Sequence, residues 1–117
     1  MMSDFDFEAL RQALENRDVE KLLGLYDRSV QATVVNKNTP PSRPFRTSDW
    51  ADFETYIRDL CDRDLEHVVG NEVIGHARAS YTETCEYPDG TKVVNATVLE
   101  LSDGLITGQT VVETWDE

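Results

Sequence analysis

The chain has 117 residues, of which 23 are acidic and 11 are basic, so its formal net charge at pH 7 is −12. This length suffices for one domain with a single hydrophobic core. Binding to nucleic acid or to an anionic membrane surface is not expected, because both need clustered Lys and Arg side chains.

The sequence contains no apolar run near the ~20 residues that span a bilayer. The N-terminal segment MMSDFDFEAL has neither a basic region nor an apolar signal core. We therefore expect a cytoplasmic protein. Its two cysteines, Cys61 and Cys85, are expected to be free thiols rather than a disulfide, since that compartment keeps thiols reduced.

Two helices, rather than one, are expected at the start of the chain. Phe7, Leu10 and Leu14 recur at helical spacing, and an unbroken helix would continue this apolar stripe near residues 17, 18 and 21, which are polar. The stripe instead restarts at Val19. Asp18 is suited to cap a new helix, because its carboxylate can accept hydrogen bonds from free backbone N–H groups of the first turn.

A strand, a loop and a third helix are expected next. Residues 30–36 are rich in β-branched side chains, which favour a strand. The segment KNTPPSRP predicts a loop, because each Pro lacks a backbone donor and disfavours helix in the residue before it. Ser48 is the expected cap of the third helix, whose apolar stripe contains Trp50, Phe53, Ile57 and Leu60.

The remainder of the chain is expected to form strands joined by tight turns. YPDGT (87–91) suits a three-residue hairpin with a left-handed glycine, and SDGL (102–105) suits a two-residue hairpin. Gly70-Asn71 is a weaker candidate for another turn. The predicted strand pairs are Glu86–Lys92 and Arg78–Glu100 in the first hairpin, and Leu101–Ile106, Asn95–Val112 and Thr91–Asp116 in the second. The two opposite-charge pairs favour this register.

The predicted register gives the sheet two faces. The inner face, expected against the helices, contains Ala77, Ala79, Tyr81, Glu83, Cys85, Val93, Asn95, Thr97, Leu99, Leu101, Ile106, Thr110, Val112 and Asp116. The outer face contains His76, Arg78, Lys92, Val94, Ala96, Val98, Gln109, Val111, Glu113 and Trp115. Its valine-rich centre, with Val94, Val98 and Val111, has a charged rim and predicts a homodimer through this face.

The order of the elements resembles the nuclear-transport-factor-2-like superfamily, and within it the SnoaL-like and ketosteroid-isomerase-like proteins. The similar stretches are ALENRDVEKLLGLYDRSV, PFRTSDWADFETYI and LELSDGLITGQTVVETWDE. The resemblance implies a single SnoaL-like domain over residues 1–117. It also implies a cone-shaped α+β fold, in which three N-terminal helices pack on a curved, mostly antiparallel sheet around an apolar pocket.

The resemblance also bears on activity. Members of the superfamily include isomerases, cyclases, dehydratases and epoxide hydrolases, together with proteins that only bind, and members often dimerise through the outer sheet face. Leu10 falls roughly where the isomerases have an oxyanion-binding tyrosine, and Val34 falls near the place of their catalytic base. Neither side chain can transfer a proton, so typical ketosteroid isomerase chemistry is not expected.

Glu83, Asn95, Tyr81 and Asp116 form the main candidate site on the predicted inner face. A carboxylate in an apolar cavity loses hydration and can exchange protons near neutral pH, so Glu83 and Asp116 are the candidate catalytic residues. Tyr81 and Asn95 are the candidate groups that orient the substrate. The alternative is that both carboxylates lie near strand ends in water.

The other candidate substrate-binding residues are mainly aromatic. Tyr26, Trp50, Phe53 and Tyr56 are suited to the wall of a ligand site, although aromatic side chains at helical spacing also form ordinary core. Asn36 is at the end of the first strand, where it either lines the mouth of the pocket or only begins the loop.

No metal site and no cofactor are expected. His67 and His76 both fall on the outer face if the chain turns at Gly70-Asn71, without a Cys or carboxylate at ligand spacing. Cys85 has no positively charged neighbour on its face and is expected to be inert. The sequence lacks the GxSxG and GxGxxG motifs, which argues against serine hydrolase and nucleotide-dependent chemistry.

Two functional hypotheses follow. The first is a cofactor-free enzyme of the cyclase, isomerase, dehydratase or hydrolase type, acting by carboxylate acid/base chemistry on a small apolar molecule. The second is a ligand-binding or dimerisation module of the same fold without chemistry. An enclosed cavity beside a desolvated carboxylate favours the first, and a cavity filled by Trp50 and Phe53 favours the second.

Overall fold

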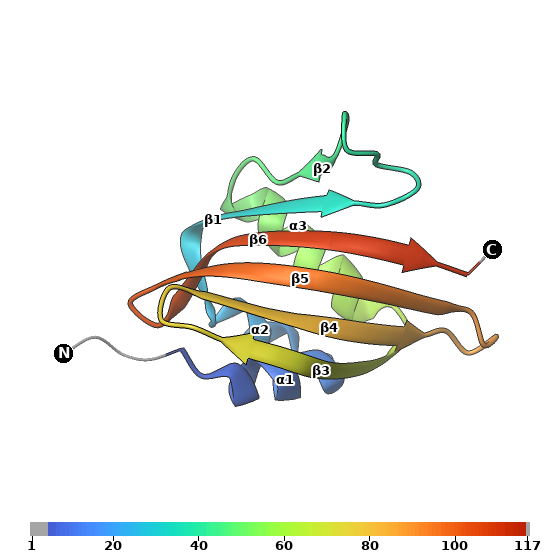
Figure 1. Cartoon of the computed structure of the whole chain (residues 1–117), viewed down its shortest axis with the longest axis horizontal. Helices are drawn as coiled ribbons and strands as arrows, with labels where there is room; N and C mark the ends of the chain where they lie inside the picture. Colours follow the sequence, from blue (N-terminus) through green and yellow to red (C-terminus); the bar gives the residue numbers. More distant parts are fainter. Residues whose placement is uncertain (1–4, 117) are drawn as a thin grey trace.

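The structure is a computed structural model that describes residues 5–116. It has three helices and one six-stranded sheet, in which the strands lie in the order β2-β1-β6-β5-β4-β3 (Figure 1). The elements are α1 (Phe7–Glu15), α2 (Val19–Leu23), β1 (Tyr26–Val35), β2 (Phe45–Arg46), α3 (Trp50–Asp62), β3 (Glu66–Ile74), β4 (Arg78–Glu86), β5 (Lys92–Ser102) and β6 (Leu105–Trp115). None of the described helices has the length and apolar content that crossing a bilayer requires.

The sheet is mostly antiparallel, and the helices cover one of its faces. Only the pair of β1 and β6 is parallel. Helix α1 packs beside β3 at one edge, and α3 packs beside β1 near the other (Figure 1). The α+β class is therefore confirmed. The expectation of three N-terminal helices holds only for α1 and α2, because α3 follows the first two strands.

The predicted break between the first two helices is confirmed. Asp18 has a non-helical backbone, and its side chain accepts a hydrogen bond from the backbone N–H of Lys21. Asp6 caps α1 in the same way, through the N–H of Ala9. The bend lets the apolar stripes of both short helices face the sheet.

The third helix begins one residue later than predicted. Its cap is Asp49, whose carboxylate accepts from the N–H of Asp52 at 2.9 Å. Ser48 instead donates to Asp52 through both its backbone N–H and its hydroxyl group. The first strand is also longer than expected, since β1 begins at Tyr26.

The first of the two predicted hairpins has the expected register. The turn after β4 closes through the bond from Tyr87 N–H to the Thr91 carbonyl, with Gly90 at a φ of +91°. The observed pairs Glu86–Lys92 and Arg78–Glu100 are the ones expected from charge. The second turn lies at Asp103-Gly104, as predicted, and Leu101 pairs with Ile106.

Beyond Ile106 the predicted register of β6 is wrong by one residue. Thr107 is an extra residue, because Leu101 pairs with Ile106 while Glu100 pairs with Gly108. This bulge exchanges the two faces for the rest of the strand, since side chains alternate with a period of two. Gln109, Val111, Glu113 and Trp115 therefore face the helices, and Thr110, Val112, Thr114 and Asp116 face outward.

The glycine after the extra residue makes the bulge compact. A Cβ atom at Gly108 would lie 2.5 Å from Oε2 of Glu100, so the carboxylate end of the opposite side chain occupies this space. The Thr107 hydroxyl donates to the Glu100 carbonyl at 3.3 Å.

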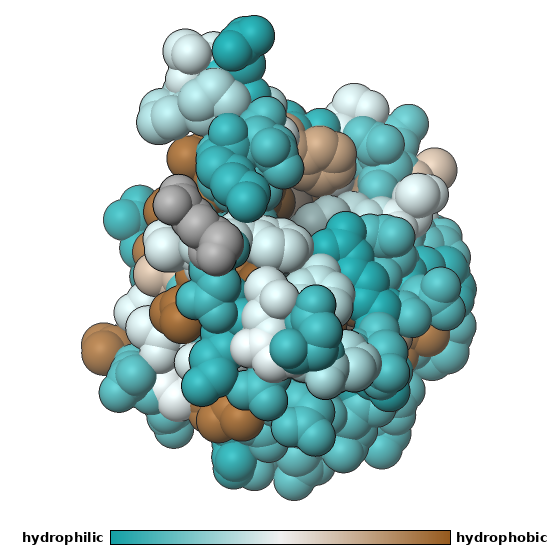
Figure 2. All heavy atoms as spheres, turned by 90° about the vertical axis from the view of Figure 1, so that its right-hand side faces the viewer, coloured by the Kyte–Doolittle hydropathy of each residue, from teal (hydrophilic) through white to brown (hydrophobic). Residues whose placement is uncertain are grey.

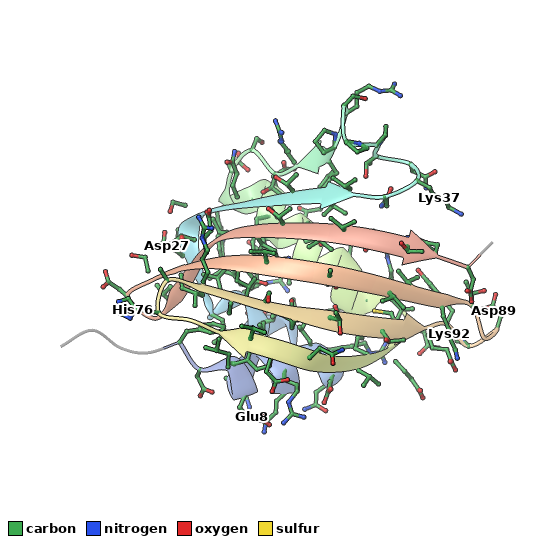
Figure 3. All side chains as sticks on the ribbon, viewed as in Figure 1. Glu8, Asp27, Lys37, His76, Asp89 and Lys92 are labelled. Atoms are coloured by element: carbon green, nitrogen blue, oxygen red, sulfur yellow. The ribbon has the colours of Figure 1, made fainter. Side chains whose placement is uncertain are left out.

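The predicted turn at Gly70-Asn71 is also wrong. Strand β3 continues to Ile74, and an irregularity between Gly70 and Val73 is absorbed by Asn71, whose φ is +55°. As a result His67 lies on the inner face and is buried, whereas His76 lies at the exposed end of the sheet (Figure 3).

The hydrophobic core lies between the helices and the inner face of the sheet. Its largest completely buried apolar side chains are Phe53, Leu10, Leu22, Ile57, Leu99 and Ile106. Each contributes roughly 1.5–3 kcal/mol by leaving water. The core is filled near α1, α2 and the start of β6, and it becomes polar toward the middle of β4 and β5, where the candidate site lies.

Two neighbouring valines test the register of β6. We expect Val111→Asp to prevent folding, because Val111 is 3% exposed and an unpaired carboxylate in the core costs several kcal/mol. Val112→Asp should retain the folded chain, since that side chain is 51% exposed. Circular dichroism during thermal unfolding shows whether each of the two variants is folded. A folded Val111→Asp beside an unfolded Val112→Asp would contradict the observed register.

Candidate active site

A small enclosed cavity lies between the sheet and the helices. Its volume is about 20 Å³, which is room for about one water molecule. Its lining combines apolar side chains from the helices with polar side chains from four strands: Leu14, Tyr26, Tyr56, Ile57, Leu60, Tyr81, Glu83, Asn95, Thr97, Gln109, Val111 and Glu113. Neither Trp50 nor Phe53 is part of this lining.

Glu83 is the centre of a buried hydrogen-bond network. It is 4% exposed, and its Oε2 lies 2.6 Å from Nδ1 of His67 on β3. Its Oε1 accepts from the side-chain amide of Asn95 on β5 at 3.1 Å, and Asn95 in turn accepts from the Thr97 hydroxyl at 3.0 Å. The network crosses three adjacent strands and places a carboxylate, held by two partners, at the wall of the cavity.

His67 was predicted to lie on the outer face, and this prediction is wrong, because the side chain is buried on the inner face. Both Glu83 Oε2 and the Cys85 sulfur, at 3.3 Å, approach the same ring nitrogen, Nδ1. The other nitrogen, Nε2, is buried and makes no hydrogen bond within residues 5–116. The tautomer with its proton on Nδ1 donates to Glu83 and leaves no N–H without an acceptor. A cysteine–histidine–carboxylate relay is excluded, because it needs both ring nitrogens.

His67, Glu83 and Cys85 are also the residues that could hold a metal ion. One donor atom from each lies within 4.8 Å of the others, and all three side chains are buried. Two ligands about 2.0 Å from a tetrahedral zinc ion lie about 3.3 Å apart. The Nδ1–Oε2 distance of 2.6 Å is shorter and is that of a hydrogen bond. This arrangement is therefore that of a hydrogen-bonded pair.

Burial and charge shape the chemistry of the thiol and the phenols. Burial, and next the Glu83 carboxylate, raise the pKa of Cys85 to about 12, so the thiol is a poor nucleophile at neutral pH. Burial also raises the pKa of Tyr26, Tyr56 and Tyr81, which keeps these hydroxyl groups protonated as donors. Tyr26 uses its hydroxyl to donate to Oε1 of Gln109 at 2.7 Å.

Glu113 and Asn36 connect the cavity to the loop after β1. The Asn36 amide donates to Glu113 Oε1 at 2.8 Å, while its own oxygen accepts from the backbone N–H groups of Asn38 and Thr39. Asn36 therefore begins the loop, which is one of the two alternatives for it. It does not line the cavity itself but contacts Glu113, which does. Glu113 was missed as a site residue because the bulge at Thr107 was not predicted.

An open groove lies next to the cavity. It has a volume of about 410 Å³, within the size range of small-molecule sites, and it runs between α3 and the β1–β2 edge. The residues lining it are Val34, Asn36, Thr39, Phe45, Asp52, Thr55, Tyr56, Asp59 and Arg63. Tyr56 lines both the groove and the cavity, so its side chain forms part of the wall between them.

Three predicted site residues lie elsewhere. Asp116 is exposed on the outer side and accepts from the backbone N–H of Lys92 at 2.9 Å, so its predicted inner position is wrong. Phe53 is completely buried core, with its ring 4.6 Å from that of Tyr26. Trp50 is half-buried, and the Arg28 guanidinium lies 4.9 Å from its ring centre. The sequence-predicted residues that line the cavity are Tyr26, Tyr56, Tyr81, Glu83 and Asn95.

A single sheet in this order, with helices over one face, is the fold of the nuclear-transport-factor-2-like proteins. An NTF2-like protein of unknown function from Mesorhizobium loti superposes with a TM-score of 0.76 at 13% identity, covering 92% of this chain and 87% of the other. A ketosteroid isomerase candidate from Kribbella flavida superposes with a TM-score of 0.72 at 19% identity. This match covers 95% of this chain and 75% of the other. An LEH-like epoxide hydrolase from M. tuberculosis superposes with a TM-score of 0.66 at 18% identity. This match covers 94% of this chain and 79% of the other.

The comparisons establish the fold and no more, because these identities are low. No protein-family model and no curated protein sequence matches the chain.

The two cysteines provide a test of the site environment. With a pKa of about 12, Cys85 has a thiolate fraction of about 10⁻⁴ at pH 8. Cys85 is also buried, whereas Cys61 is only partly buried. We expect iodoacetamide to modify Cys61 much faster than Cys85 in the native chain, and to modify both in denaturant, as measured by peptide mass spectrometry. Equal native rates would contradict the described environment of Cys85.

Proposed function

We propose that this chain is a cofactor-free acid/base enzyme for a small, largely apolar molecule, with Glu83 as the proton-transferring residue. The observation that supports it is the burial of Glu83 at the wall of an enclosed cavity, with His67 at 2.6 Å and Asn95 at 3.1 Å. A carboxylate held in fixed geometry and shielded from water is suited to proton transfer.

The roles of the other residues follow from their positions. His67 and Asn95 hold the two oxygens of Glu83, so they orient the carboxylate toward the cavity. Tyr26, Tyr81 and Asn95 line the cavity and orient the reacting end of the substrate. The cavity is far smaller than the groove beside Tyr56, so the apolar body of the substrate occupies the groove. Asp116 has no role in this proposal.

The proposal is tested with whatever small molecule copurifies with the chain, identified by mass spectrometry. In D₂O the native chain should catalyse exchange of deuterium into an acidic C–H of that molecule. Glu83→Gln should reduce the exchange rate by about 100-fold or more, which is the usual contribution of a general base. Asp116→Asn should leave it unchanged.

An unchanged exchange rate in a folded Glu83→Gln would overturn the acid/base role. Thermal unfolding of each variant establishes that it is folded. A ligand that binds without any exchange in the native chain would favour the second candidate function, a module that binds without chemistry.

The second candidate function is assembly through the outer sheet face. We propose a homodimer through Val94, Val98 and Val112, which are 47%, 47% and 51% exposed. They surround Ala96, which pairs with Val112 on the neighbouring strand. Val111, predicted to belong to this face, points inward instead and is 3% exposed.

The charges around this face are compatible with self-association. Arg78 pairs with Glu100 at one end of strands β4 and β5. Lys92 lies 3.7 Å from Glu86 at the other end. Each end thus carries one acid and one base, so two copies can meet without a large excess of like charge, despite the acidity of the whole chain.

The dimer is tested by one substitution at its centre. We expect Val98→Glu to convert the dimer to a monomer, because two carboxylates would be buried without partners. Ala51→Glu, a change at an exposed position of α3 on the opposite side of the sheet, should leave the dimer intact. Sedimentation equilibrium measures both variants. A native chain that stays monomeric at all accessible concentrations would overturn the proposal.

A further inference from the structure

The cavity is negatively charged. Two of its lining residues are glutamates, and within residues 5–116 no Lys, Arg or His contributes to the lining. The carboxylate of Glu83 has an imidazole partner in His67, whereas Glu113 forms no ion pair among the described residues. One Glu113 oxygen accepts from the neutral amide of Asn36. A partly buried carboxylate without a cation favours a positively charged ligand.

Aromatic rings surround the same space. Tyr26, Tyr56 and Tyr81 all line the cavity. The electron-rich face of an aromatic ring attracts a cation, and the attraction is stronger where water is excluded. A site that combines tyrosine rings with a carboxylate has the features by which proteins bind ammonium groups.

The size of the cavity restricts the cation further. Its room for about one water molecule suits a primary ammonium group, which is similar in size to water. Arginine-like guanidinium and quaternary ammonium groups are larger. The rest of such a ligand would lie in the adjoining groove, where the rings of Phe45 and Tyr56 are 5.6 Å apart and present an apolar surface.

The groove also disfavours anions. Its charged side chains are Asp52, Asp59 and Arg63, and Arg63 is paired with Asp59 at 2.6 Å. Asp52 is held by Ser48 and has no cationic partner among the described residues. The groove therefore has a small negative excess, and the net charge of −12 adds a long-range attraction for cations.

We propose that the ligand of this site is a primary amine with an aromatic or apolar body. Its ammonium group is held by Glu113 among the three tyrosines, and its body lies in the groove against Phe45 and Tyr56. This inference rests on the proposed small-molecule pocket and adds the chemical class of the ligand.

Three naphthalene probes of nearly equal shape test the inference: 2-naphthylmethylamine, 2-naphthalenemethanol and 2-naphthoate. At pH 7 they are a cation, a neutral molecule and an anion. Binding is measured by isothermal titration calorimetry at 0.15 M salt. We expect the amine to bind roughly 10-fold or more tightly than the alcohol, as a charge-assisted hydrogen bond provides, and the naphthoate to bind most weakly.

Two variants with the same change in net charge show which carboxylate is responsible for the preference for the amine. Glu113→Gln should remove the preference for the amine over the alcohol, and its side chain can still accept from Asn36. Asp116→Asn should leave the preference unchanged, because Asp116 lies outside on the same strand end. An equal loss in both variants would indicate only general attraction to an acidic chain and would overturn the inference.

The outcomes separate this inference from the proposed function. If the alcohol binds as tightly as the amine and Glu113→Gln changes nothing, the ammonium site is refuted while the small-molecule pocket stands. Absence of binding by all three probes also refutes the ammonium site. Deuterium exchange that depends on Glu83 can persist in either case, because it is measured on the copurified molecule.

Discussion

Strand β6 accommodates one residue more than its partner β5, and the positions of the site residues depend on this local geometry. Thr107 has no partner on β5, and Glu100 folds its carboxylate over the glycine that follows. From this point to the end of the strand, every side chain lies on the opposite face of the sheet from the one it would have in a ladder without a bulge. The bulge therefore places Gln109 and Glu113 in the cavity and Val112 on the surface. Without it, the cavity would be lined on that side by Thr110 and Val112.

The parts of the fold that could be predicted are those encoded by local chemistry. The change in helical phase at Asp18, the left-handed glycine at Gly90 and the opposite-charge pair Glu86–Lys92 beside it all act within a few residues, and the structure contains each of them. The register of β6 could not be found from hydrophobicity, because Val111 and Val112 are identical and either can face the core. The available signal was Gly108, since an isolated glycine inside a strand often marks a bulge.

The candidate site was predictable only in part, for the same reason. Glu83, Asn95 and Tyr81 lie on strands whose register is fixed by the turn at Pro88–Gly90, and they line the cavity as expected. His67 was missed because Gly70-Asn71 forms an irregularity within β3 rather than a turn. Its partnership with Glu83 joins residues 16 positions apart in the sequence, on strands whose pairing is set by the true turn after Ile74. The end of the molecule that contains the C-terminus is mainly hydrophilic (Figure 2).

Asn36 connects the wall of the cavity to the loop after β1, at the surface of the molecule. Its oxygen organises the start of the loop through Asn38 and Thr39, and its amide nitrogen holds Glu113 at the cavity wall. A ligand that draws Glu113 away from this amide weakens the anchorage of the loop, and a partner that fixes the loop strengthens the hold on Glu113. Thermodynamic linkage makes these two effects equal in free energy. One side chain, Asn36, therefore joins the loop after β1 to the wall of the cavity.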